Sequence, residues 1–129
     1  MIYVDSRLVI YAVEHPGAVG DRARSLLGDP AHTFAISPLV VLEALVGPMR
    51  ARNRALRSRY EDAFANFRLL DIPVEAYLHA AELRAAHPSL RTADALHLSA
   101  AQHGDCSALW TNDRRLAAAS AGFAIDVLG

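Results

Sequence analysis

The chain has 129 residues, 53% of them hydrophobic, and a formal net charge of −1. This apolar content is enough for a hydrophobic core in one domain over residues 1–129, without disulfide or metal staples. Cys106 is the only cysteine, which excludes an internal disulfide, and no apolar stretch is long enough to span a membrane, so we expect a cytoplasmic protein. All 13 basic residues are arginines, because the chain contains no lysine.

Short apolar segments alternate with helical patterns along the chain. The predicted strands cover residues 1–4, 32–37, 68–72, 107–112 and 123–128, and the predicted helices cover 7–14, 19–28, 38–46, 51–67, 73–87, 92–104 and 113–121. This alternation is typical of an α/β domain with a mostly parallel sheet of four or five strands and helices on both faces. We expect Gly47 and Pro48 to stop or kink the third helix.

Four acidic residues interrupt this pattern. Asp5 directly follows the first predicted strand, and Asp113 follows the fourth. Asp94 lies near the start of an alanine- and leucine-rich helix, and Glu43 is surrounded by apolar residues in the third helix. Because functional sites in open α/β sheets gather at the carboxyl ends of the strands, we expect the four carboxylates to converge there.

Each acid also has a purely structural explanation. Asp5 and Asp113 could each cap the helix that follows. Asp94 could complement the dipole of a helix that is capped by Thr92. Glu43 could form a buried ion pair with one of the arginines. Four converging carboxylates would nevertheless repel one another, and a divalent cation with oxygen ligands would remove that repulsion.

A carboxylate cluster without histidine or cysteine at ligand spacing favours Mg²⁺ or Mn²⁺ and metal-assisted phosphoryl chemistry. A metal-activated water would then hydrolyse a phosphodiester and leave 5′-phosphate and 3′-hydroxyl ends. Ser6, Thr111 and Asn112 follow the first and fourth strands, where they could orient the carboxylates or simply cap strand ends. His97, three residues after Asp94, is better explained as a hydrogen-bonded core histidine than as a ligand or proton shuttle.

The four acids lie in the segments "MIYVDS", "ISPLVVLEAL", "TADALHLSAA" and "LWTNDRRL". These segments resemble the four acidic motifs of PIN-domain ribonucleases, and especially of the VapC toxins of VapBC toxin–antitoxin modules. The resemblance spans nearly the whole chain, and by motif Asp5, Glu43, Asp94 and Asp113 correspond to the metal-binding acids of the family. Arg7 departs from the pattern, because related toxins usually carry a small or polar residue there.

The resemblance implies a three-layer αβα sandwich that forms a homodimer. It also implies Mg²⁺- or Mn²⁺-dependent cleavage of RNA and inhibition by a cognate VapB antitoxin. We therefore expect an endoribonuclease that acts as the toxin of a toxin–antitoxin module. The alternative is a non-catalytic PIN-like module that binds RNA or a protein without cleavage, and substitution of Asp5 or Asp94 by asparagine would distinguish the two.

Arginines are concentrated at two places that could bind an RNA backbone or an acidic antitoxin segment. The first group contains Arg50, Arg52, Arg54 and Arg57, together with Arg59. The second group is the pair Arg114 and Arg115, directly after Asp113. The first group could equally form a solvated helix face.

Two other classes of protein also place aspartates at strand ends. Receiver domains and haloacid-dehalogenase-like phosphatases usually hold phosphate with a lysine, which this chain lacks. The phosphatases also need an acid at the position of Arg7. A different mechanism, in which histidines promote RNA cleavage through the 2′-hydroxyl, would be supported by undiminished cleavage in excess EDTA.

Overall fold

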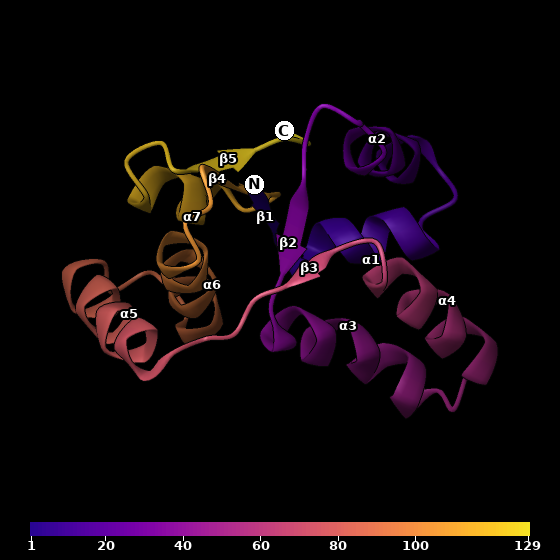
Figure 1. The fold of residues 1–129 in the computed structure, drawn as a ribbon, viewed down its shortest axis with the longest axis horizontal. Coiled ribbons are helices and arrows are strands. Elements are labelled where there is room, and N and C mark those ends of the chain that lie inside the picture. The colour runs from indigo at the N-terminus through magenta and orange to yellow at the C-terminus, as the bar shows by residue number, and fades with distance from the viewer.

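A computed structural model describes residues 1–129 and contains the five strands and seven helices in the predicted order (Figure 1). The strands are β1 (Ile2–Val4), β2 (Phe34–Ile36), β3 (Arg68–Leu69), β4 (Ala108–Thr111) and β5 (Ala124–Asp126). The helices are α1 (Ser6–Glu14), α2 (Ala18–Leu27), α3 (Pro38–Arg50), α4 (Arg54–Phe64), α5 (Val74–Ala86), α6 (Thr92–His103) and α7 (Arg114–Ala119). The predicted α/β class is therefore confirmed.

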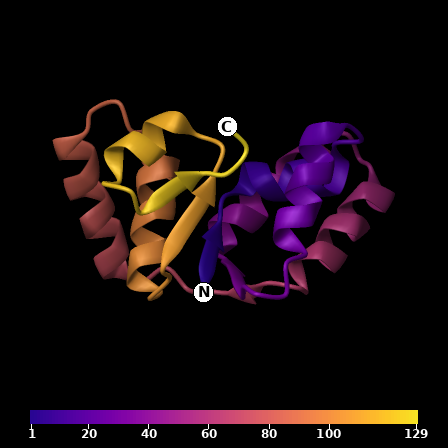
Figure 2. The same ribbon diagram turned by 90° about the horizontal axis from the view of Figure 1, so that it is seen from above.

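The strands form one sheet in the order β3-β2-β1-β4-β5, and every neighbouring pair is parallel. The carboxyl ends of all five strands therefore lie at one edge of the sheet. Helices α1 to α4 gather on one side of the sheet and α5 to α7 on the other, which gives the expected three-layer αβα sandwich (Figures 1 and 2). Strand β1 lies in the centre and is wholly buried.

The hydrophobic core joins the central strands to the helices on both sides. Its most deeply buried side chains include Val4, Leu8, Ile36, Val40, Leu98, Leu109 and Leu116. Burial of such side chains contributes about 1.5–3 kcal/mol each to stability. Because β1 and β4 are packed on both faces, the residues that directly follow them are held in fixed positions. None of the helices combines the length and the apolar character needed to cross a membrane.

We expected Gly47 and Pro48 to stop or kink helix α3; the helix continues past them, so of these two outcomes the stop was wrong. Pro48 lies inside the helix and is buried, and the helix ends at Arg50. Gly47 has no Cβ, which removes the clash that proline imposes on the residue before it. The next helix begins later than predicted, because the side chain of Asn53 caps it and fixes its start at Arg54.

Gly20 provides a test of the close packing between α1 and α2. A Cβ added to Gly20 would lie 1.9 Å from the carbonyl oxygen of His15, so the backbone would have to move. We expect Gly20→Ala to lower the free energy of unfolding by about 1–3 kcal/mol, although alanine ordinarily favours a helix. Ser25→Ala, at an exposed site of the same helix, should change it by less than about 0.5 kcal/mol. Urea denaturation measures both, and equal stability of the two variants would contradict this contact.

Candidate active site

Four carboxylates line one small cavity at the carboxyl edge of the sheet. Asp5 follows β1, Glu43 lies in α3, Asp94 lies in the first turn of α6 and Asp113 follows β4. The cavity has a volume of about 130 Å³ and is lined by Asp5, Ser6, Arg7, Glu43, Arg91, Ala93, Asp94, His97 and Asp113. The four acids therefore converge as the sequence predicts, and we call this cavity the acid pocket.

Asp5 and Asp113 also cap helices. Asp5 accepts hydrogen bonds from the backbone N–H of Arg7 at 2.9 Å and from the hydroxyl of Thr111 at 2.6 Å. Asp113 accepts from the backbone N–H of Arg115 at 2.9 Å, at the start of α7. The N–H of Asp113 donates to the Thr111 hydroxyl oxygen at 3.0 Å, so Thr111 links the two acidic segments. A capping role and a place in the acid pocket are thus compatible.

Glu43 is paired with a buried histidine rather than with an arginine. Nε2 of His97 contacts Oε1 of Glu43, and Nδ1 of His97 lies 2.7 Å from the hydroxyl oxygen of Tyr3. That hydroxyl also lies 2.6 Å from Oγ of Ser37. When Nε2–H donates to Glu43, Nδ1 accepts from Tyr3 and Tyr3 accepts from Ser37, which satisfies every polar group in this chain. His97 is therefore the hydrogen-bonded core histidine that the sequence favoured, and it also holds Glu43 in place.

The charge of Glu43 is stabilised by these partners. Burial acts to raise the pKa of Glu43, but the hydrogen bond to His97, the electrostatic attraction of its ring and the Ser6 hydroxyl together lower the pKa below its ordinary value. Burial raises the pKa of Tyr3, so its hydroxyl keeps the proton that it donates. Glu43 is consequently held as an ionised carboxylate at the wall of the acid pocket.

Asp94 is the least compensated of the four acids. It has no side-chain hydrogen bond or ion pair, whereas each of the other three has at least one. Burial, and then the negative charges of Asp113 and Asp5, raise the pKa of Asp94 above its ordinary value. The residue before the helix is Arg91, so the expected cap by Thr92 was wrong: Thr92 is the first helical residue and its hydroxyl accepts from Arg84.

The carboxylate oxygens of the four acids suit a hard divalent cation, although in the structure these side chains do not surround a single point. No group of three or more acidic, histidine or cysteine side chains is arranged so that it could hold a metal ion as the side chains stand. The reason is local, because Asp5, Asp113 and Glu43 each point at least one oxygen at another partner. A carboxylate can accept about four hydrogen bonds or ligand contacts, so each keeps free lone pairs, and the mutual repulsion felt by Asp94 favours a cation.

Arginines surround the mouth of the acid pocket. A second cavity of about 220 Å³ is lined by Arg7, Arg91, Asn112, Asp113, Arg114 and Arg115, three of which also line the acid pocket. The four arginines are exposed, and we call them the arginine rim. Sequence reasoning singled out Arg114 and Arg115 but missed Arg7 and Arg91 as parts of the site. Their positions directly beside a strand-end acid and a helix-start acid were the available signal.

The remaining predicted residues fall into two places. Ser6 donates to Asp5 at 3.4 Å and Thr111 donates at 2.6 Å, so both orient that carboxylate. Asn112 lies in the rim cavity but makes no hydrogen bond to any of the four acids. The other predicted arginines, Arg50, Arg52, Arg54 and Arg57, lie at the distant end of α3 and the start of α4 and do not line the acid pocket.

Comparison with known proteins agrees with this geometry. A toxin–antitoxin complex from Klebsiella pneumoniae contains a chain of similar fold, with 21% identity, a TM-score of 0.80 and 98% coverage of both chains. VapC20 of Mycobacterium tuberculosis, described as a toxin that cleaves the sarcin–ricin loop, has 16% identity, a TM-score of 0.80 and 98% coverage of both chains. VapBC2 from Rickettsia felis, bound to a DNA fragment of its promoter, has 22% identity, a TM-score of 0.69 and 88% coverage of both chains.

At these identities the solved structures establish the fold and no more. Comparison with curated protein sequences gives no match. The sequence model of the PIN domain, in contrast, matches residues 2–122, which include all four acids of the acid pocket. The parallel sheet, the strand-end acids and this match lead to one conclusion: the chain belongs to the PIN-domain family.

Proposed function

We propose that this protein is a divalent-metal-dependent endoribonuclease that acts as the toxin of a toxin–antitoxin module. The observation that carries the proposal is the acid pocket, where four carboxylates of a PIN domain converge inside a rim of arginines. Two chains of similar fold come from a toxin–antitoxin complex and from a toxin described as cleaving RNA of the sarcin–ricin loop. Both the chemistry of the pocket and this likeness support RNA as the substrate.

Asp5, Asp94 and Asp113 would be the principal ligands of Mg²⁺ or Mn²⁺, and Glu43 would be a further ligand or would orient the attacking water. Such a cation lowers the pKa of a water molecule and neutralises developing charge on the phosphate. The protein contributes the positions of these groups: Thr111 and Ser6 hold Asp5. His97 holds Glu43 from the core side of the pocket.

The arginine rim would bind the phosphates on both sides of the scissile bond. Guanidinium groups pair with phosphate oxygens through two parallel hydrogen bonds, which fixes the strand as well as attracting it. Arg7 and Arg91 lie beside the acids, and Arg114 and Arg115 extend the rim outward. An acidic pocket alone would repel RNA, so the rim is what makes a polyanionic substrate compatible with four carboxylates.

An antitoxin is the proposed protein partner. The chain covers 98% of a chain in a toxin–antitoxin complex, and the two folds agree over that length. A mostly apolar groove of about 380 Å³ is lined by Val9, Ala12, Val13, Arg24, Leu27, Gly28, Ala63, Asn66 and Phe67, from α1, α2 and the end of α4. We assign this groove to an apolar segment of the antitoxin. The single cysteine and an RNA substrate are consistent with action in the cytoplasm.

A homodimer is the proposed assembly. Helices α3 and α5 expose Leu42, Val46, Tyr77 and Leu78, and a hollow of about 530 Å³ between these helices is mostly apolar. Contiguous exposed apolar surface of this kind is typical of protein interfaces. None of the residues that line this hollow also lines the acid pocket or the rim cavity.

Asp94→Asn tests the catalytic role of the acid pocket. We expect RNA cleavage to fall by about 10²-fold or more, because one ligand is lost without loss of volume. We also expect a higher melting temperature without metal, because the raised pKa of Asp94 means that its ionised form destabilises the fold at neutral pH. Asp62→Asn, an exposed change on α4, should alter neither quantity. A binding module would instead keep its biological effect in the Asp94→Asn variant.

Removal of divalent cations tests the metal requirement. We expect excess EDTA to abolish cleavage and added Mg²⁺ or Mn²⁺ to restore it, and the products should carry 5′-phosphate and 3′-hydroxyl ends. Sequencing of cleaved RNA ends gives the chemistry directly. Undiminished cleavage in EDTA, with cyclic phosphate ends, would instead indicate attack by the 2′-hydroxyl and would overturn the metal proposal.

Leu42→Glu tests the dimer interface. A buried, unpaired carboxylate in the centre of an apolar interface should raise the dimer dissociation constant by about 10-fold or more, which is about 1.4 kcal/mol. Val19→Glu, at an exposed apolar position on α2, is the matched control and should remain dimeric. Light scattering coupled to size exclusion measures both variants, and a wild-type chain that is monomeric at high concentration would refute the proposed assembly.

A further inference from the structure

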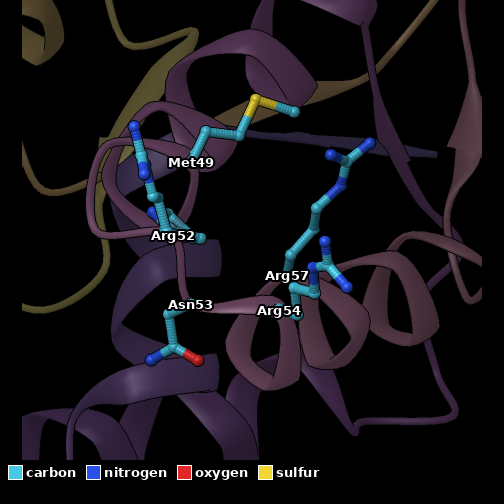
Figure 3. A pocket seen from close by; sticks show the side chains of 6 residues that line it. Met49, Arg52, Asn53, Arg54 and Arg57 are labelled. Carbon is cyan, nitrogen blue, oxygen red and sulfur yellow. The ribbon is translucent and has the colours of Figure 1, made fainter.

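A second strongly basic cavity lies at the turn between α3 and α4, away from the acid pocket. It has a volume of about 320 Å³ and is lined by Pro48, Met49, Arg52, Asn53, Arg54 and Arg57. Figure 3 shows Arg52 on one side of the open space and Arg54 and Arg57 on the other, with Met49 above. We call this cavity the hairpin pocket. Three guanidinium groups line it and no carboxylate does.

The fold accounts for some arginines of this region but not for Arg52 and Arg54 of the pocket wall. Arg59 donates to the carbonyl oxygen of Val13 and so ties α4 to α1. Arg57 pairs with Glu61 at 2.9 Å. Arg52 and Arg54 are exposed and form no side-chain hydrogen bond or ion pair. Their charges are therefore free to bind a ligand.

The backbone of Arg52 strengthens this argument. Its φ angle of 52° lies in the left-handed region, where a glycine would be free of strain. An arginine at such a position lowers stability, and its side chain forms no hydrogen bond or ion pair that would offset the cost. The side chain of Arg52 is consequently better explained by an external ligand than by the stability of the turn.

The chemistry of the pocket favours phosphate groups. Planar guanidinium groups bind phosphate oxygens in pairs. The pocket also includes the start of α4, where the helix dipole adds positive charge. A volume of about 320 Å³ is larger than one phosphate needs, and the open pocket therefore suits several linked phosphates.

The hairpin pocket and the acid pocket lie at different positions along α3. Glu43 lines the acid pocket, whereas Pro48 and Met49 line the hairpin pocket. Arg50 is seven residues after Glu43, which corresponds to about 10 Å along the helix axis. This distance equals about three nucleotides of a stacked strand at about 3.4 Å per step. A strand of phosphates that extends from the acid pocket along α3 therefore covers this axial distance within a few nucleotides.

We propose that the hairpin pocket binds the backbone of the substrate RNA several nucleotides away from the bond that is cleaved at the acid pocket. This inference rests on the proposed ribonuclease function. Arg52 and Arg54 are positioning residues in this proposal, since they contact phosphates of the substrate but not the reacting atoms. The enzyme would consequently prefer RNA that extends past the cleavage site over short fragments.

The first experiment measures binding separately from cleavage. The affinity for a fluorescein-labelled RNA hairpin is measured by anisotropy in the Asp94→Asn background, with and without the double change Arg52→Ala and Arg54→Ala. The dissociation constant should rise about 10-fold, and the slope of log affinity against log salt should become shallower by about 0.7 for each lost contact. Removal of two arginines elsewhere, Arg22→Ala with Arg68→Ala, is the matched control and should have little effect.

The second experiment compares long and short substrates of the cleaving enzyme. In the double variant at Arg52 and Arg54, KM for the RNA hairpin should rise about 10-fold with kcat unchanged. Cleavage of a short RNA that fills only the acid pocket should not change. Equal losses for the two substrates, or an affinity equal to that of the control variant, would overturn the proposal.

Two further outcomes separate this proposal from binding of an acidic protein segment at the hairpin pocket and from the proposed ribonuclease function. Unchanged RNA affinity with lost co-purification of the antitoxin would assign the pocket to an acidic protein segment and overturn our inference. If the wild type does not cleave RNA while binding still weakens as expected, the ribonuclease proposal fails and RNA binding by the pocket stands. Arg52→Gly guards against misfolding: it should raise or preserve the melting temperature and still weaken RNA binding.

Discussion

The mutual repulsion of four carboxylates is the constraint on which the rest of the site depends. It follows from the sheet itself, because β1 and β4 are parallel neighbours and their carboxyl ends bring Asp5 and Asp113 to the same edge, where the Thr111 hydroxyl bonds both segments. Helices α3 and α6 then bring Glu43 and Asp94 to the same cavity. In a partly buried space such charges are costly unless each finds a partner.

The fold compensates three of these charges with ordinary protein groups. Backbone N–H groups at helix starts donate hydrogen bonds to Asp5 and Asp113, and the buried His97 is hydrogen-bonded to Glu43. Asp94 has the dipole of its own helix, worth about 0.3–1 kcal/mol, and the nearby charge of Arg91. Burial, and then repulsion by Asp113 and Asp5, outweigh them and raise the pKa of Asp94. The electrostatic strain of the pocket is thus concentrated on one residue, which is the arrangement expected where a cation completes the site.

The sequence predicted the fold and the acid cluster well, because both depend on local signals. Apolar runs, helix starts and strand-end acids are each visible in a few neighbouring residues. What it missed depends on distant contacts: the partner of Glu43 is His97, 54 residues away, and Arg91 reaches the site from the end of a loop. The continuation of α3 through Pro48 was missed because a preceding glycine changes the usual effect of proline.

The same reasoning explains why the net charge of −1 gives no indication of the RNA substrate that we propose. Four of the 14 acidic residues line the acid pocket, where a cation would neutralise much of their charge. All 13 basic residues are arginines. Nine of the arginines are accounted for by the rim and by the arginine-rich stretch of α3 and α4. These two surfaces are therefore more basic than the composition suggests, and a formally acidic chain can bind a polyanion.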